Sequence, residues 1–174
     1  MGRCGYVDSS GKVKVPFDLL DSCYTENFKT LAIVRFKSKR GVYAIDKQLN
    51  SKFRVLRSID PEENIEGTFR FANRSKKIGL ADMEGNIILE AVFDLILGFN
   101  NLALVNLGGE WDWEGNPCES CAEFKGGKWG IFDLNGEPVL KVFYDRRWEE
   151  GKTLLERGDE RYLLDIDKGV VKIN

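Results

Sequence analysis

The sequence predicts an all-β fold, an array of about four and a half antiparallel repeat units in which each full unit is a hairpin plus a third strand. Three observations carry this prediction. Short β-branched and aromatic runs recur between Gly, Asn and Asp residues, aspartate turns return at repeat-like intervals, and no amphipathic period is long enough for a substantial helix. An open twisted array is favoured over a closed, propeller-like barrel.

The repeated element is a strand, a tight turn and a second strand. Its clearest copy is Gly127 to Leu140, with Asp133-Leu134-Asn135-Gly136 at the centre. Asp and Asn tolerate turn dihedrals and glycine supplies the positive φ of a short loop. The equivalent aspartates are Asp8, Asp46, Asp82, Asp133 and Asp165. We expect each to cap the backbone amides of its own turn, because side chains spaced once per unit do not converge on one site.

The turn aspartates are separated by 38, 36, 51 and 32 residues, which divides the chain into units. Within a single domain spanning 1–174, the expected units are 1–38, 39–75, 76–125 with an insertion at 108–123, 126–157, and a partial unit 158–174. Aromatic-Asp pairs follow the second strand at Phe17-Asp18, Phe93-Asp94 and Tyr144-Asp145. At most a single helical turn is expected, at 18–24 or 146–150.

Glycines at one position of the first strand are expected to allow close packing by a neighbouring backbone or ring. They are Gly5, Gly79 and Gly130. The large rings at or beside the equivalent position, Trp129, Tyr43 and Tyr162, are expected to pack in the core or between units and not to contact a ligand.

The segment Gly127-Lys128-Trp129-Gly130, followed by Asp133, Gly136 and an aromatic-Asp pair, resembles the WG repeat, named for its Trp-Gly pair. The resemblance extends over essentially the whole chain, although Cys4 and Ile78 replace the Trp, and Tyr43 and Tyr162 replace the Gly, in other units. WG repeats are widespread in bacterial proteins and have no agreed single activity. The resemblance implies a β-repeat scaffold and favours a binding role.

The insertion breaks the repeat, since the third unit is about 15 residues too long. Insertions in repeat proteins commonly form loops on a binding face. Alternation along a strand would place Trp111 and Trp113 on one side, so the sequence predicts a binding site. Its residues are Trp111, Asp112, Trp113, Glu114 and Asn116. The alternative is that the loop folds back and buries both rings as a lid over the array.

The cysteines allow several interpretations. Zinc usually takes four ligands and the chain has no histidine, so a site at Cys118 and Cys121 would also have to recruit Cys4 and Cys23. A thioredoxin-type pair lacks its helical setting. Free thiols are therefore the expected state, with metal binding by Cys118 and Cys121 as the alternative.

Charge and composition exclude several functions. The net charge is −2, from 26 basic and 28 acidic residues, without the basic excess typical of nucleic-acid binding. No apolar run approaches the ~20 residues of a membrane span, and no signal-peptide core is visible, so a cytoplasmic location is expected. Without histidine there is no Ser-His or Cys-His pair, and no motif indicates a cofactor.

These observations favour a non-enzymatic module that binds another protein, of the size and acidity of an immunity protein or inhibitor paired with a toxin. A carbohydrate-binding module that uses the same Trp-rich insertion is the alternative. A more remote one is a hydrolase that uses carboxylates such as Asp112, Glu114, Glu149 and Glu150, although nothing sets two of them at a defined separation. The sequence leaves the partner and the oligomeric state open.

Overall fold

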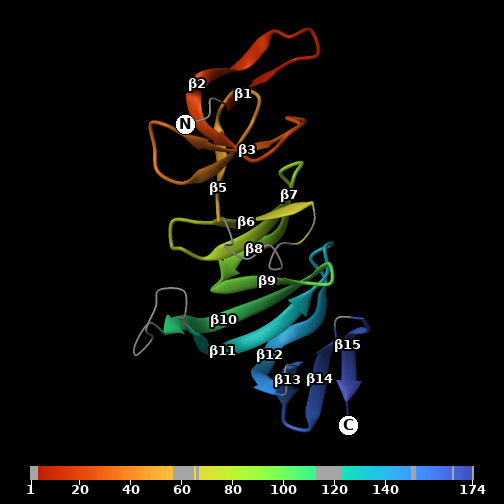
Figure 1. Ribbon diagram of the computed structural model, residues 1–174. Coiled ribbons are helices and arrows are strands. Elements are labelled where there is room, and N and C mark those ends of the chain that lie inside the picture. The colour runs from red at the N-terminus through yellow and green to blue at the C-terminus, as the bar shows by residue number, and fades with distance from the viewer. Residues whose placement is uncertain are drawn as a thin grey trace. The chain divides into compact units, whose positions relative to one another are not determined.

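The computed structural model describes residues 4–56, 65, 67–112, 123–149, 152–165 and 167–173, with the side chains of 123, 148 and 149 excepted. Over these residues the protein consists of antiparallel strands and turns, without a helix, which confirms the all-β prediction (Figure 1). The strands form an eight-stranded and a seven-stranded sheet, and in both each strand neighbours the next one along the chain.

The eight-stranded sheet contains β1 (Cys4–Val7), β2 (Val13–Cys23), β3 (Ala32–Phe36), β4 (Val42–Ile45), β5 (Ser51–Val55), β6 (Thr68–Ala72), β7 (Ile78–Asp82) and β8 (Ile87–Phe93). The seven-stranded sheet contains β9 (Leu95–Phe99), β10 (Leu102–Asp112), β11 (Glu123–Phe132), β12 (Pro138–Glu149), β13 (Lys152–Arg157), β14 (Glu160–Asp165) and β15 (Gly169–Ile173). Among these described strands, the outer two of each sheet do not pair with one another, so both sheets are open, as predicted.

The strands follow the predicted repeat. Hairpins β1–β2, β4–β5, β7–β8, β11–β12 and β14–β15 surround the five turn aspartates. The third unit differs, because its second strand is interrupted at Asp94 and resumes as β9 before the closing strand β10. The segments considered for a helical turn belong to strands instead: 18–23 to β2 and 146–149 to β12.

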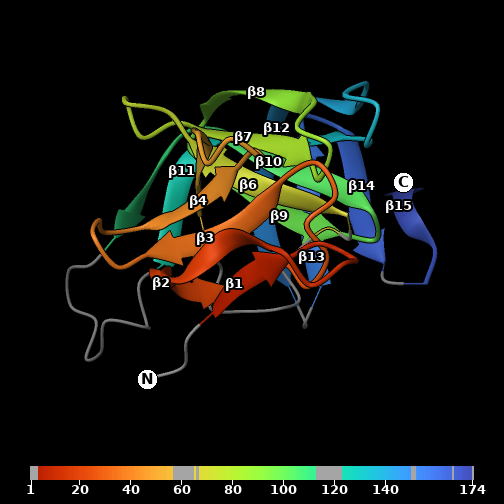
Figure 2. The same cartoon turned by 90° about the horizontal axis from the view of Figure 1, so that it is seen from above.

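The contacts divide the chain into two compact lobes, which we describe separately. Lobe 1 comprises 1–59 and 67–91, and lobe 2 comprises 60–66 and 92–174. Figure 2 shows β1 to β4 of lobe 1 as successive neighbours. The core of lobe 2 contains Trp129, Ile131 and Leu155, with Tyr162 packed against it. Tyr43 packs in the same way against a core cluster of lobe 1, so the three large rings at the repeat position have the packing role predicted.

The turn aspartates act as caps, as predicted. The Asp133 Oδ1 accepts hydrogen bonds from the backbone N–H groups of Asn135 at 2.9 Å and Glu137 at 2.8 Å. Asp46 receives the equivalent pair from Gln48 and Asn50, both at 2.9 Å. These bonds favour the charged carboxylate. The side-chain and backbone hydrogen bonds of Asn50, together with Lys52 and Gln48, lower the pKa of Asp46 to about 2.

The repeat glycines lie against a carbonyl of the next strand. A Cβ atom at Gly130 would lie 2.8 Å from the Leu140 carbonyl oxygen, and one at Gly5 would lie 2.5 Å from that of Val15. At Gly79 the Leu89 carbonyl oxygen would be 2.7 Å away. Real Cβ contacts are longer than this, so only glycine fits without a shift of the strands. The predicted reason for these glycines is confirmed.

Cys4 and Cys23 form a disulfide that ties β1 to the end of β2. The expectation of free thiols is therefore wrong for these two residues. Their sulfurs are also not available for the four-cysteine zinc site considered above. Cys118 and Cys121, the alternative metal ligands, lie outside the described residues.

Candidate binding ribbon

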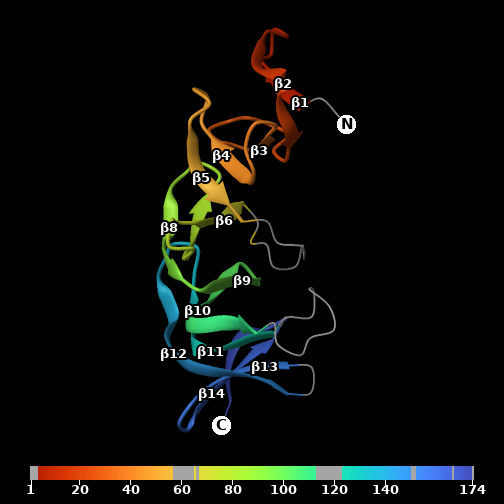
Figure 3. The same cartoon turned by 90° about the vertical axis from the view of Figure 1, so that its left-hand side faces the viewer.

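The predicted insertion begins and ends as paired strand. β10 and β11 keep one register from Ala103 opposite Phe132 to Asp112 opposite Glu123, so they run side by side over their whole length (Figure 3). Residues 108–112 therefore continue a strand where a loop was expected. We call 108–112 together with 123–127 the ribbon. The predicted site residues Trp113, Glu114 and Asn116 lie outside the described residues, whereas Trp111 and Asp112 belong to the ribbon.

A kink separates the ribbon from the rest of the sheet. Gly108 has φ +85°, and across from it Gly126 and Gly127 have φ +73° and +68°. Glycine adopts these values readily, whereas a residue with a side chain rarely does. The kink also changes which way the side chains point. Phe124 and Trp129 are five residues apart and would face opposite sides of a regular strand, yet their ring centroids are 6.0 Å apart.

Two polar side chains hold the kink in place. Asn106 is fully buried; its Oδ1 accepts a hydrogen bond from the Gly109 N–H at 2.9 Å and its Nδ2 donates to the Gly126 carbonyl at 3.1 Å. The Asp94 Oδ2 accepts a hydrogen bond from the Gly108 N–H at 2.7 Å. A buried amide is stable when its donor and acceptor are both paired, and here the pairing clamps β10 to β11. The ribbon therefore leaves the sheet in a fixed direction.

Aromatic rings connect the ribbon to the core. Trp111 contacts Phe124, directly opposite it, edge to face with 5.3 Å between ring centroids. Phe124 in turn contacts Trp129, which is 3% exposed, while Trp111 is 46% exposed. Such edge-to-face pairs are stabilising beyond the area they bury. Trp111 is thus half-exposed and anchored on one edge.

The acidic residue beside it is paired. The Asp112 Oδ2 accepts a hydrogen bond from the Lys125 Nζ at 2.8 Å across the ribbon. Because successive residues of a strand face opposite sides, this ion pair lies on the side of the ribbon away from the indole of Trp111. Within the described part of the chain, no group of three or more Cys, Asp or Glu side chains could hold a metal ion. Of the carboxylates considered for a hydrolase, only that of Asp112 is described.

Sequence reasoning placed Trp111 and Asp112 in the candidate site and did not identify the residues that contact or support the ribbon. Asn106, Asp94 and Phe124 were not predicted to contribute. A signal was present: the doublets Gly108-Gly109 and Gly126-Gly127 enclose the insertion symmetrically, which is typical of a strand pair that bends at one level.

The fold and the ribbon define a β-repeat protein with an extended hairpin. Residues 78–111, from the start of β7 to Trp111, match the family model described as WG containing repeat. The match lies on the third unit, with its Ile78-Gly79 pair, and this unit is therefore similar to a WG repeat. No curated protein and no solved structure matches the chain. In the described residues, no helix has the length and apolar character needed to cross a membrane.

Proposed function

We propose that this protein is a non-enzymatic binding module that presents the ribbon to another protein, in the manner of a bacterial immunity protein or inhibitor. The observation that carries the proposal is Trp111, a half-exposed indole on a strand pair that projects beyond the kink. Tryptophan is enriched among the residues that dominate protein–protein binding energy.

The construction of the ribbon supports this role. Binding is weakened by every side chain or loop that must become ordered on association. Phe124 supports one edge of the Trp111 ring, and the Asn106 clamp fixes the strands below it. The Trp111 side chain and the strands below it therefore need little further ordering when a partner binds. The Asp112–Lys125 ion pair is a further link between the two strands that carry the indole.

The repeated carboxylates support a non-catalytic assignment. Asp8, Asp46 and Asp133 are each engaged with the N–H groups of their own turns. An acid–base residue needs a free carboxyl beside a reacting group, whereas these are caps with a lowered pKa.

The disulfide is evidence on the cellular compartment of the protein. Disulfides persist in oxidising surroundings and are rare in the reducing cytoplasm of mesophiles. The Cys4–Cys23 bond therefore favours an oxidising compartment over the cytoplasmic location that the sequence predicts. Thiol alkylation of the protein directly on cell lysis would distinguish the two, because only a cytoplasmic protein would label at both cysteines.

The function is tested with Trp111→Ala. The protein is immobilised, its partner is captured from lysate of the source cells, and the affinity is then measured with purified partner. We expect Trp111→Ala to weaken binding about 30-fold or more, as loss of a central anchor does, with the melting temperature nearly unchanged. The control is Phe143→Ala, since Phe143 is a similarly exposed ring on β12, away from the ribbon.

Equal affinity of the Trp111→Ala variant and the unchanged protein would reject the ribbon as the binding site. The carbohydrate alternative is favoured by one observation, the half-exposed indole of Trp111, since sugars stack on aromatic rings. A glycan array decides between them: a sugar bound by the unchanged protein and lost in Trp111→Ala would replace the protein partner with a carbohydrate.

A further inference from the structure

A second candidate site lies within lobe 2, apart from the ribbon residues. It is a cavity of about 480 Å³, partly open to solvent, beside strands β9, β10, β12, β13 and β14. Its apolar wall includes Leu97, Phe99, Leu104 and Leu163. The charged residues that line it are Arg146, Lys152 and Asp165. A cavity of this size, apolar with a few charged groups, is typical of small-molecule sites.

Arg146 is the distinctive residue of the cavity. Its guanidinium lies over the ring of the buried Trp129, with 4.8 Å from Cζ to the ring centroid. Its Nε is buried and has no hydrogen-bond partner in the described part of the protein. Burial also lowers the pKa of Arg146, although an arginine remains charged in proteins. The guanidinium therefore lies at the cavity with a buried Nε that no described residue satisfies.

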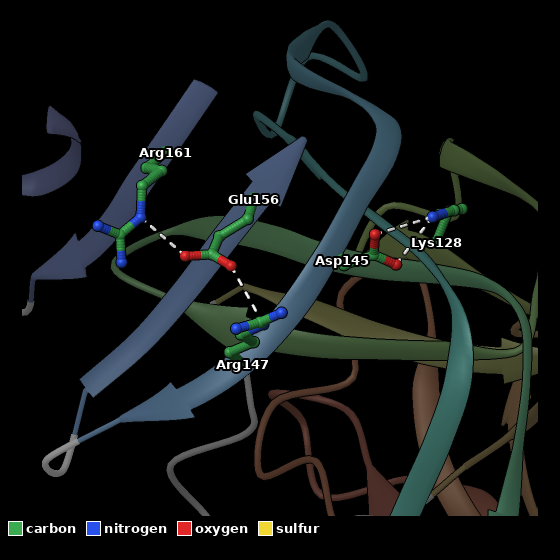
Figure 4. A network of polar contacts seen from close by, with 5 residues as sticks. All are labelled: Lys128, Asp145, Arg147, Glu156 and Arg161. Atoms are coloured by element: carbon green, nitrogen blue, oxygen red, sulfur yellow. Dashed lines mark hydrogen bonds and ion pairs between the residues drawn. The ribbon is translucent and has the colours of Figure 1, made fainter. Parts of the chain in front are cut away.

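The next arginine along the strand, in contrast to Arg146, is paired with a carboxylate. Arg147 is on the same strand, and its Nε lies 3.1 Å from Glu156, which also pairs with Arg161 at 2.8 Å (Figure 4). Successive residues of a strand point to opposite faces. The structure thus satisfies the arginine of the outer face with a carboxylate and places Arg146 at the cavity without one.

We propose that the cavity binds an organic monocarboxylate with an apolar body, and that Arg146 receives the carboxylate. A guanidinium matches a carboxylate with two parallel hydrogen bonds, and a guanidinium stacked on a ring is held in the plane such a pair needs. The ligand supplies the acceptor that the described residues lack. Its apolar body occupies the space between Leu97, Phe99 and Leu163.

The charge at the cavity is complementary to one negative charge on the ligand. Arg146 and Lys152 contribute two positive charges, and Asp165 contributes one negative charge. The backbone N–H groups of Lys168 and Asp167 donate to Asp165 and lower its pKa, so it remains ionised at neutral pH. The sum is one positive charge, which a monocarboxylate neutralises. A phosphate dianion would leave the occupied cavity with a net negative charge.

The test uses the full-length protein and a matched pair of probes, 4-phenylbutyrate and its uncharged amide, 4-phenylbutyramide. Binding is followed through the backbone amide NMR shifts of Gly98, Thr153 and Leu163, which line the cavity or adjoin it. We expect the acid to bind at least about tenfold more tightly than the amide, since a charge-assisted bond is lost in the amide. Arg146→Met, which keeps an unbranched chain over Trp129, removes this preference.

The matched control is Arg147→Met, one residue along β12, which leaves the preference for the acid unchanged. Equal binding of acid and amide, or no shift of the cavity amides with either probe, overturns the proposal. If Arg146→Met does not fold, the comparison of acid with amide in the unchanged protein still decides. The proposal is independent of the ribbon, because Trp111→Ala is expected to leave binding of 4-phenylbutyrate unaltered.

Discussion

Gly126 and Gly127 differ in a way that their similar backbone angles conceal. Both have φ near +70°, at +73° and +68°. Nothing lies within 4 Å of a Cβ atom built on Gly126, whereas one on Gly127 would lie 2.5 Å from the amide nitrogen of Gly109. Gly126 is therefore needed only for its backbone conformation. Gly127 is needed for its conformation and also because a side chain there would clash with the opposite strand and with the amide of Asn106.

This difference predicts the effects of two substitutions. Gly126→Ala and Gly127→Ala introduce comparable backbone strain, since both place alanine at positive φ. We expect Gly127→Ala to cost about 1–3 kcal/mol more, because its methyl group must also displace the opposite strand. The measurement is urea unfolding of each variant. Equal losses in free energy of unfolding would mean that the kink adjusts freely and does not fix the ribbon.

The role of a single residue could be predicted from the sequence where that residue acts within its own turn. Asp133 caps N–H groups two and four residues away, so residue type and spacing were enough to predict its role. Asn106 could not be found in this way. Its amide is paired with Gly109 and with Gly126, which is 20 residues away, and only the register of β10 on β11 brings them together.

Among the elements, the second strand of a unit explains why some units keep the glycine. In the fourth unit, Trp129 pairs with Tyr144 and Ile131 with Leu140, so β12 carries extra residues opposite Gly130. Such a bulge bends the strand toward its neighbour. In the partial fifth unit Tyr162 replaces the glycine, and β14 pairs with β15 without a register shift. Of these two units, the one whose second strand is bulged has the glycine, and the one whose second strand is regular has a tyrosine in its place.

Strand positions were predictable from the short apolar runs, but strand lengths were not. β2 and β12 extend over 11 and 12 residues, past the aromatic-Asp pairs that seemed to end them. A bulge interrupts the alternation of apolar and polar residues, so a continuous strand looks like two segments in the sequence. The ends of the insertion were expected to be loop and proved to be strand, because there the glycines of the kink interrupt the apolar pattern while the register of β10 on β11 continues.

The hairpin turns predict how stability depends on pH. The pKa of Asp8 and that of Asp46 fall from an ordinary value of 3.8 to about 2 in the folded protein. Carboxylates with a lowered pKa stabilise the fold above the unfolded value and lose that contribution as the pH falls through the folded value. We therefore expect the urea midpoint to be steady above about pH 5 and to decrease between about pH 4 and pH 2.

A matched variant isolates one turn. Asp46→Asn keeps an acceptor for the N–H groups of Gln48 and Asn50 but does not titrate, and Asn73 already caps a β6–β7 turn in this way, with Ser75 and Lys77 as donors. The variant should lose less stability between about pH 4 and pH 2 than the unchanged protein. Parallel pH profiles of the two proteins would count against a role of the Asp46 charge.

For the whole molecule, the disulfide links residues 19 apart within lobe 1. Cross-linking a loop of this length restricts the unfolded chain and is worth about 3 kcal/mol in free energy of unfolding. We expect a reducing agent to lower the urea midpoint of the lobe 1 transition, followed by circular dichroism. The double variant Cys4→Ser with Cys23→Ser should show the lower midpoint without reductant and no further change with it.

If the unchanged protein unfolds at the same midpoint with and without reductant, the cross-link does not contribute to the stability of lobe 1. This bond was not predictable from the sequence. Cys4 and Cys23 have no motif in common, and only the bulge in β2, which pairs Cys4 with Leu20, brings the end of that strand back to β1.

The division into lobes has an optical consequence. All four tryptophans, at positions 111, 113, 129 and 148, fall in the segment 92–174, whereas Tyr6, Tyr24 and Tyr43 fall in lobe 1. Emission excited selectively from indole therefore reports on lobe 2 alone, and tyrosine absorbance adds the signal of lobe 1. Without any introduced label, indole emission follows lobe 2 by itself, while tyrosine absorbance, to which Tyr144 and Tyr162 also contribute, follows both lobes.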